Sequence, residues 1–288
     1  MTIREKGYHQ WEGELQTPKT PWMPIFLSGI RMVFKRKFAK LLFITSCLPF
    51  VFFLIVIYIS TRPELEMFKD AVKFLTDDRM VFDSIMSNGP TIFLLMLMGI
   101  FFGSDLISGD IQSRSFPLYF SRPLERKDYL LGKYAILMFY YLLFTLVPGL
   151  VLVLFKVIFT GKILFTPRFI AALILTPVLT SIFLASLTLV ISSLSGNSKY
   201  SRIMLILLFY MATPVTAILS HAFSGQYFFL FGPTSTIKQM SSFLFDAKLA
   251  FKYPGWLSLA LIVLVSIGSY FFLHRRIGKL EAQIESGN

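Results

Sequence analysis

Stretches of roughly twenty apolar residues recur along most of this chain, and they constrain its fold more than any other feature. A helix of that length crosses a hydrocarbon core of about 30 Å, so each stretch is a candidate transmembrane helix. The chain of 288 residues has only 15% charged residues, and its mean hydropathy is +0.67. The 32 Phe residues lack the strand-like alternation of a barrel. The sequence therefore predicts an all-α polytopic membrane protein.

We expect six transmembrane helices, the second of them short. They span residues 41–60, 91–106, 130–155, 169–194, 203–223 and 256–273. The chain then divides into an N-terminal segment (1–40), a transmembrane domain (41–273) and a C-terminal tail (274–288). Lys and Arg gather before the first span and after the last, which predicts that both termini are cytoplasmic. With six spans, residues 61–89 and 224–255 would face the exterior.

The segment before the first span, "PIFLSGIRMVFKRKFAK", has an amphipathic pattern. One helical face carries the apolar residues Phe26, Ile30, Val33 and Phe34. The basic residues Arg31, Lys35 and Arg36 point elsewhere. This pattern predicts an N-terminal helix lying on the membrane surface, with a frayed extension of the first span as the alternative.

No motif in the chain indicates catalysis, a bound cofactor or a metal site. Gly132-Lys133 is followed by Tyr134, so the phosphate-binding loop that requires Ser or Thr at that place is missing. Cys47 is the only cysteine, and the three histidines lie far apart. The net charge of +12 fits contact with anionic lipid headgroups better than contact with nucleic acid.

Residues 105–134, "DLISGDIQSRSFPLYFSRPLERKDYLLGKY", form a polar segment between two spans. A connection between helices needs only about 2–8 residues. Ser108 is a candidate helix cap, Pro117 a candidate helix end, and Glu125 suits the first turn of the next helix. We therefore expect a short helix across the cytoplasmic face, tied to spans two and three. Its basic and aromatic residues suit a protein partner and lipid headgroups equally well.

The residues of this segment resemble type-2 ABC transporter permeases, in which a pattern such as I-S-x-E-I-x-x-G-T, followed by S-x-P-[IL]-x-R-x-x-[YF]-L-L-G-K, is typical. The matching residues are Ser108, Asp110, Ile111, Gln112, Ser121, Pro123, Arg126, Tyr129, Gly132 and Lys133. Asp110 replaces the usual Glu, and Arg114-Ser115 replaces the usual Gly-Thr pair. The six spans, the amphipathic lead-in and the "SSLSGNSKYS" loop extend the resemblance over nearly the full chain.

The resemblance implies the permease subunit of an exporter, whose coupling helix docks on a separate ATPase. The coupling residues it implies are Ser108, Asp110, Ile111, Gln112, Arg114, Phe116, Tyr119, Arg122 and Arg126. ATP and Mg would bind two copies of the partner ATPase, and a second permease subunit would complete the assembly in the cell membrane. The resemblance also implies short re-entrant helices within residues 224–255, with an ordinary external loop as the alternative. A non-transporting scaffold or sensor remains an alternative function, as does an ion-coupled carrier. A proton-coupled carrier would be expected to have a carboxylate near the middle of a span, and the predicted spans contain none.

Overall fold

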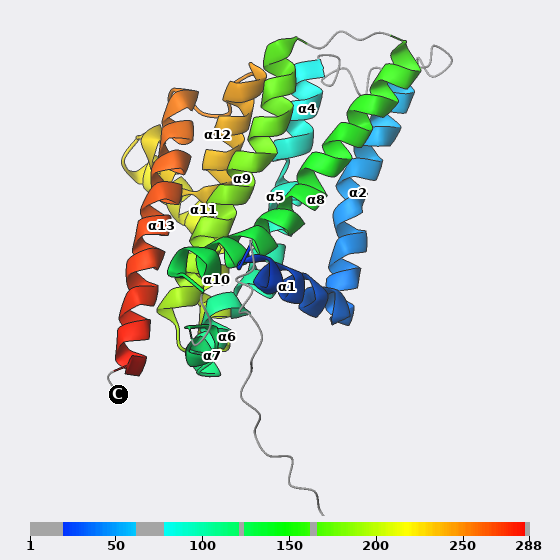
Figure 1. Ribbon diagram of the computed structural model, residues 1–288. Helices are drawn as coiled ribbons and strands as arrows, with labels where there is room; N and C mark the ends of the chain where they lie inside the picture. Colours follow the sequence, from blue (N-terminus) through cyan, green and yellow to red (C-terminus); the bar gives the residue numbers. More distant parts are fainter. Residues whose placement is uncertain (1–19, 62–77, 121–123, 162–165, 286–288) are drawn as a thin grey trace, which may run out of the picture.

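The computed structural model describes residues 20–61, 78–120, 124–161 and 166–285, which form helices packed side by side (Figure 1). In chain order these are α1 (Met23–Lys35), α2 (Lys37–Thr61), α4 (Asp78–Ser87), α5 (Gly89–Met98), η3 (Gly99–Gly103), α6 (Asp105–Gln112), α7 (Phe116–Phe120), α8 (Arg126–Thr160), α9 (Pro167–Leu194), α10 (Ser198–Ile206), η4 (Leu207–Met211), α11 (Ala212–Ala222), η5 (Gln226–Phe231), α12 (Pro233–Phe245) and α13 (Gly255–Glu285).

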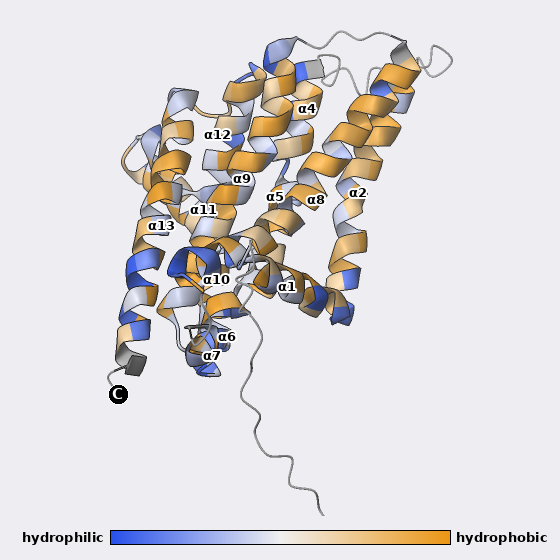
Figure 2. Ribbon diagram, in the orientation of Figure 1, coloured by the Kyte–Doolittle hydropathy of each residue, from blue (hydrophilic) through white to orange (hydrophobic). Residues whose placement is uncertain are grey.

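Six helical stretches in the described part of the chain are long and apolar enough to cross a bilayer. They are Lys37–Ile59, Arg79–Gln112, Arg126–Phe159, Pro167–Leu194, Ser198–Ala222 and Gly255–Ala282. The predicted all-α fold and the number of spans are confirmed, and the chain is a multi-pass membrane protein. In Figure 2 the apolar colour covers the middle of the bundle.

Helix α9 forms the centre of the bundle and contacts α8, α12 and α13. Small hydroxyl side chains cover much of its length, and Ser181, Ser186 and Thr188 are completely buried. Lipid tails provide no hydrophobic force between helices, so close packing through small residues stabilises such contacts. Ser181 and Thr188 donate to backbone carbonyls one turn back, which satisfies their buried hydroxyls.

The predicted start of the second span is wrong. Its helix begins at Asp78 and runs through α4, inside the stretch expected to be an external loop. Asn88 joins α4 to α5, because its side chain accepts a hydrogen bond of 2.7 Å from the Thr91 amide. The polar residues of α4 resemble a loop in sequence, but Asp83 has partners on α12, about 160 positions further along the chain.

Asp83 is the main polar link between α4 and α12. Its carboxylate is buried and accepts hydrogen bonds from the hydroxyls of Ser87, at 3.3 Å, and Ser242, at 2.9 Å. Ser241 donates a third bond, at 2.5 Å. Asp83 follows the start of the candidate span by about one helical turn. It therefore holds α12 against α4 near one end of the bundle (Figure 1).

The segment between the last two spans is largely helical. The helix α12 contains the "PTSTIKQMSSFLF" stretch, and the short helix η5 precedes it. α12 packs against α4, α9 and α13, and Thr236, Ile237 and Gln239 are completely buried. The expected short helices are therefore present. Their re-entry into the membrane stays a prediction.

The last helix extends further than predicted. α13 continues to Glu285, whereas the sequence places the end of the span at Leu273 and a tail after it. Leu273 and Ile277 are completely buried one turn apart, and Leu280 packs against the same core. This apolar spacing continues one face of the helix past the basic residues, so the helix does not end where the charges begin.

Helix α1 lies across the ends of the spans and packs against α8 and α2 (Figure 1). Its inner face includes Val33, as predicted, and Ile25, which the prediction left out. Phe34, predicted on this face, remains 39% exposed at its edge and stacks on Phe43. The helical segment is confirmed. Its position at the membrane surface stays a prediction.

Glycine at position 132 allows the close approach of α1 and α8, which leads to a stability prediction. A Cβ atom there would lie 2.9 Å from two carbons of Ile25 and 3.2 Å from the Trp22 carbonyl. Gly132→Ala should therefore lower the free energy of unfolding by about 1–3 kcal/mol through overpacking. Gly268→Ala is the matched control, because nothing lies within 4 Å of its Cβ position, and it should stabilise α13 by up to about 1 kcal/mol. Thermal unfolding in detergent measures the stability of both variants. Stability changes of the same sign in the two variants would contradict the close α1–α8 packing.

Candidate functional site

Helices α6 and α7 make a polar projection at one end of the bundle, which we call the α6–α7 elbow (residues 105–120). Figure 1 shows it at the lower end of the bundle, beside the C-terminal part of α13. Figure 2 shows hydrophilic residues gathered at this end, on the elbow, on the start of α8 and on α13. The elbow is joined to α5 through the π-helical turn η3, so it continues the second span directly.

The bend of the elbow is a helix C-cap centred on Arg114. The Ser115 amide donates to the Asp110 carbonyl at 2.9 Å, and the Arg114 amide donates to the Ile111 carbonyl at 3.2 Å. This pair of bonds defines a Schellman motif, whose central residue takes the left-handed conformation that favours glycine. Arg114 has φ 51°. This conformation suits the Gly of the pattern that residues 105–134 resemble better than the Arg of this chain.

A buried ion pair ties α6 to α8. Lys133 Nζ lies 2.6 Å from Asp110 Oδ2, and the two side chains are only 6% and 15% exposed. The Tyr129 hydroxyl donates to the same oxygen at 2.7 Å. Asp110 is therefore enclosed by the start of α8. Two buried charges are tolerated only when both are paired, so the geometry of this junction is tightly specified.

Aromatic side chains of α7 pack against Tyr129 and Lys133, next to the same ion pair. The ring centroids of Phe116 and Tyr119 lie 5.5 Å and 5.4 Å from that of Tyr129. Lys133 Nζ lies 5.7 Å from the Tyr119 ring and 5.2 Å from the Tyr129 ring. Burial and the Asp110 carboxylate raise the pKa of the Tyr119 hydroxyl to about 12, so it stays neutral at physiological pH. These contacts make α7 part of one body with α8.

The first turn of α8 also binds the last helix. Arg126 Nε donates to the Glu281 carboxylate across 155 sequence positions. A Cβ atom at Gly278 would lie 2.7 Å from a guanidinium nitrogen of Arg126, so glycine leaves room for this side chain. At the same turn, Glu125 and Asp128 form a reciprocal capping box. The elbow is thus braced by α13 as well as by α8.

Serine side chains fasten α6 to α9 and α10. The Ser192 hydroxyl donates to the Ser104 carbonyl at 2.8 Å and accepts the amides of Ile107 and Ser108, both at 3.0 Å. It thereby satisfies backbone groups where the π-helical turn gives way to α6. Ser198 at the start of α10 donates its amide to Gln112 Oε1 at 3.4 Å. The small loop before α10 therefore belongs to this site.

A charged cluster lies at the start of the elbow, around the first residue of α6. Asp105 accepts from Arg36, between α1 and α2, and from Arg202 on α10, at 3.3 Å each. The side chains are 41%, 25% and 37% exposed for Arg36, Asp105 and Arg202, so solvent weakens both pairs. The cluster connects α1, α6 and α10 at one point.

The structure brings the predicted coupling residues together but gives them different surroundings. Ser108 and Phe116 are buried, Ile111 and Tyr119 are partly buried, Asp110 is enclosed, Gln112, Arg114 and Arg126 are exposed, and Arg122 lies outside the described residues. Ser108 lies within α6 and not at its cap, and Pro117 lies in the first turn of α7 instead of ending a helix. The buried side chains of this set hold the elbow in place. That the exposed side chains contact a partner stays a prediction.

Three residues that hold the elbow, Ser192, Glu281 and Ser198, were outside the predicted set. Ser192 and Ser198 lie in the "SSLSGNSKYS" loop, but no local pattern indicates a partner for any of the three, because their partners lie 84 to 155 positions away. Lys133 and Tyr129 could have been identified from the sequence, since both belong to the pattern by which residues 105–134 resemble type-2 ABC transporter permeases. The described residues contain no group of three or more His, Cys, Asp or Glu arranged to hold a metal ion.

A comparison with models of known protein families matches most of the chain. The model of a family described as "ABC-2 family transporter protein" matches residues 32–276 of the 288. The match includes the elbow, the ion pair between α6 and α8, the first five candidate spans and the sixth as far as residue 276. A search of curated proteins found no significant match.

Proposed function

The chain belongs to the ABC-2 transporter family, and from this premise we propose that it is the permease subunit of an exporter driven by a separate ATPase that docks on the α6–α7 elbow. Members of this family are membrane components of ABC transporters and generally have no catalytic activity of their own. The proposed assembly has two ATPase subunits, which bind ATP and Mg, and a second permease subunit. It lies in the cell membrane with both termini in the cytoplasm.

The single observation that supports this proposal best is the rigid attachment of an exposed elbow. α7 leaves Leu118 74% exposed, while the Asp110–Lys133 pair and the rings on Tyr129 bind its base to α8. A partner that pushes on α7 would therefore move α6 and α8 together. For work to be transmitted, the ATPase must contact the elbow differently in its open and closed states.

Reconstitution tests the proposed function. The permease would be purified with the ATPase that accompanies it, placed in liposomes and supplied with ATP and a candidate substrate. We expect transport that stops when the ATPase carries a substitution that blocks hydrolysis. Binding of the ATPase without transport of any substrate tried would favour a scaffold or sensor, and transport driven by an ion gradient without ATP would contradict the proposal.

Charge reversal at Arg114 tests the docking surface. Arg114→Glu should lower recovery of the ATPase in pull-downs by at least about tenfold, because it places a like charge against a surface expected to be acidic. Arg114→Gly is the matched control: it suits φ 51° and should raise stability by about 1 kcal/mol, with a smaller effect on recovery. Arg126 is a poorer choice because its reversal also breaks the bond to Glu281. Unchanged recovery and unchanged ATPase stimulation for Arg114→Glu would exclude this surface.

A further inference from the structure

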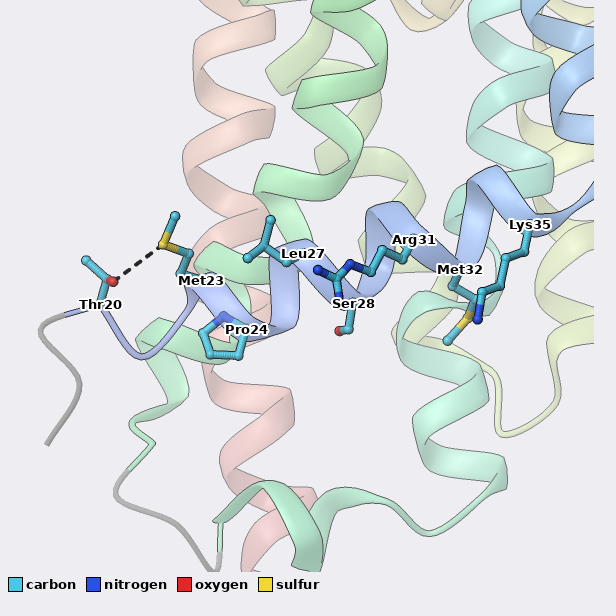
Figure 3. A pocket seen from close by; sticks show the side chains of 8 residues that line it. All are labelled: Thr20, Met23, Pro24, Leu27, Ser28, Arg31, Met32 and Lys35. Carbon is cyan, nitrogen blue, oxygen red and sulfur yellow. Dashed lines mark hydrogen bonds between the residues drawn. The ribbon is translucent and has the colours of Figure 1, made fainter. Parts of the chain in front are cut away.

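A groove runs along the outward side of α1, with a volume of about 660 Å³. It is lined by Thr20, Met23, Pro24, Leu27, Ser28, Arg31, Met32 and Lys35. Figure 3 shows these side chains in order along the helix, on the side that faces away from the bundle. The opposite side of α1 packs against α8, so the groove is a second, separate surface of the same helix.

The groove is polarised along its length. Met23, Leu27, Arg31 and Lys35 follow one another at intervals of one helical turn, so they form a single row. Met23 and Leu27 are 45% and 42% exposed at the apolar end. Arg31 and Lys35 carry the positive charge at the other end, and neither makes a salt bridge within the described ranges. A ligand that fits this row has an apolar part and an anionic part.

The groove lies directly beside the first candidate span. α1 ends at Lys35, and the first candidate span begins two positions later, at Lys37. Leu41, Ile44 and Leu48 then continue along α2 with 58%, 69% and 62% exposure. Lipid must cover these side chains where no protein does, because α2 crosses the membrane. The groove therefore adjoins a surface already in contact with lipid.

We propose that this groove binds one anionic phospholipid, with its phosphate between Arg31 and Lys35 and its apolar part against Leu27 and Met23. Cations one turn apart lie about 6 Å from each other along the helix, close enough for one phosphate group to bind both. The lipid would hold α1 at the headgroup level. This inference does not depend on the docking of an ATPase.

Native mass spectrometry of the full-length protein in detergent tests the lipid site. Titration with phosphatidylglycerol or phosphatidylcholine of the same acyl chains should show preferential binding of the anionic lipid. Arg31→Gln with Lys35→Gln should weaken phosphatidylglycerol binding by about fivefold for each cation removed, and weaken phosphatidylcholine binding less, because the choline group already neutralises the charge of its phosphate. Lys248→Gln, an exposed lysine outside α1, is the matched control. Leu27→Ser should weaken the binding of both lipids, because it removes an apolar contact with their acyl chains.

Three results would overturn the proposal. They are equal binding of the two lipids, an undiminished preference in the Arg31→Gln/Lys35→Gln variant, and displacement of the lipid by millimolar inorganic phosphate alone, which would indicate a simple anion site. Loss of a copurifying protein from this variant, with lipid binding intact, would instead identify the groove as a protein docking surface. Gel filtration and thermal unfolding establish that each variant is folded.

Discussion

Lys133→Met is expected to lower the free energy of unfolding by about 3–5 kcal/mol, because it leaves the Asp110 carboxylate buried without its cation. The two side chains are 6% and 15% exposed, so water does not replace the lost partner. Tyr129 still donates one hydrogen bond, but one bond from a neutral hydroxyl does not balance a buried charge. Thermal or denaturant unfolding in detergent measures the loss.

The double variant Asp110→Asn/Lys133→Met is the control for this prediction. Asn keeps an acceptor for the Tyr129 hydroxyl, and no unpaired charge remains, so stability should return to within about 1–2 kcal/mol of the original protein. The same pair of variants separates two roles of Asp110. If Asp110 only positions the elbow, the double variant should recover ATPase binding as well. If Asp110 touches the ATPase directly, stability should recover and binding should not.

Asp83→Ala should destabilise the opposite end of the bundle by about 2–4 kcal/mol, since three serine hydroxyls lose a charged acceptor. The effect should be local, because Asp83 holds α4 against α12. Hydrogen–deuterium exchange of the peptide covering residues 233–245 should therefore accelerate more than exchange in α8. Asp83→Asn should be milder, because its side chain still offers an acceptor and serine hydroxyls also accept hydrogen bonds.

An exposed set of ion pairs at the end of α12 provides the control for Asp83. Asp246 at the end of α12 pairs with Arg79 at 2.7 Å and with Arg168 at 3.1 Å, but all three side chains are at least 45% exposed. Asp246→Asn keeps a residue that tolerates φ 58° and should cost less than about 1 kcal/mol. An equal effect of Asp83→Ala and Asp246→Asn would show that burial of the Asp83 carboxylate does not hold α12.

The sequence alone was sufficient for the number of spans, because hydropathy over about twenty residues is a local property and the bilayer imposes the length. It was also sufficient to identify residues 105–134 as unusual, since charge between two apolar runs requires an explanation. The pattern around Asp110, Tyr129 and Lys133 indicated the family before any contact was visible, and the match over residues 32–276 confirmed it.

Only the tertiary structure decided which polar residues are surface contacts and which are internal ties. Asp110 and Arg114 are similar as charged residues of one segment, but one is enclosed by α8 and the other is exposed at a left-handed cap. In the sequence Asp83 resembles a loop residue. In the structure two of its hydrogen-bond donors lie on α12, 158 and 159 positions away. The physical reason is that burying a charge requires partners at hydrogen-bond distance, and those partners come from elements that the packing of helices brings together, wherever they lie in the chain.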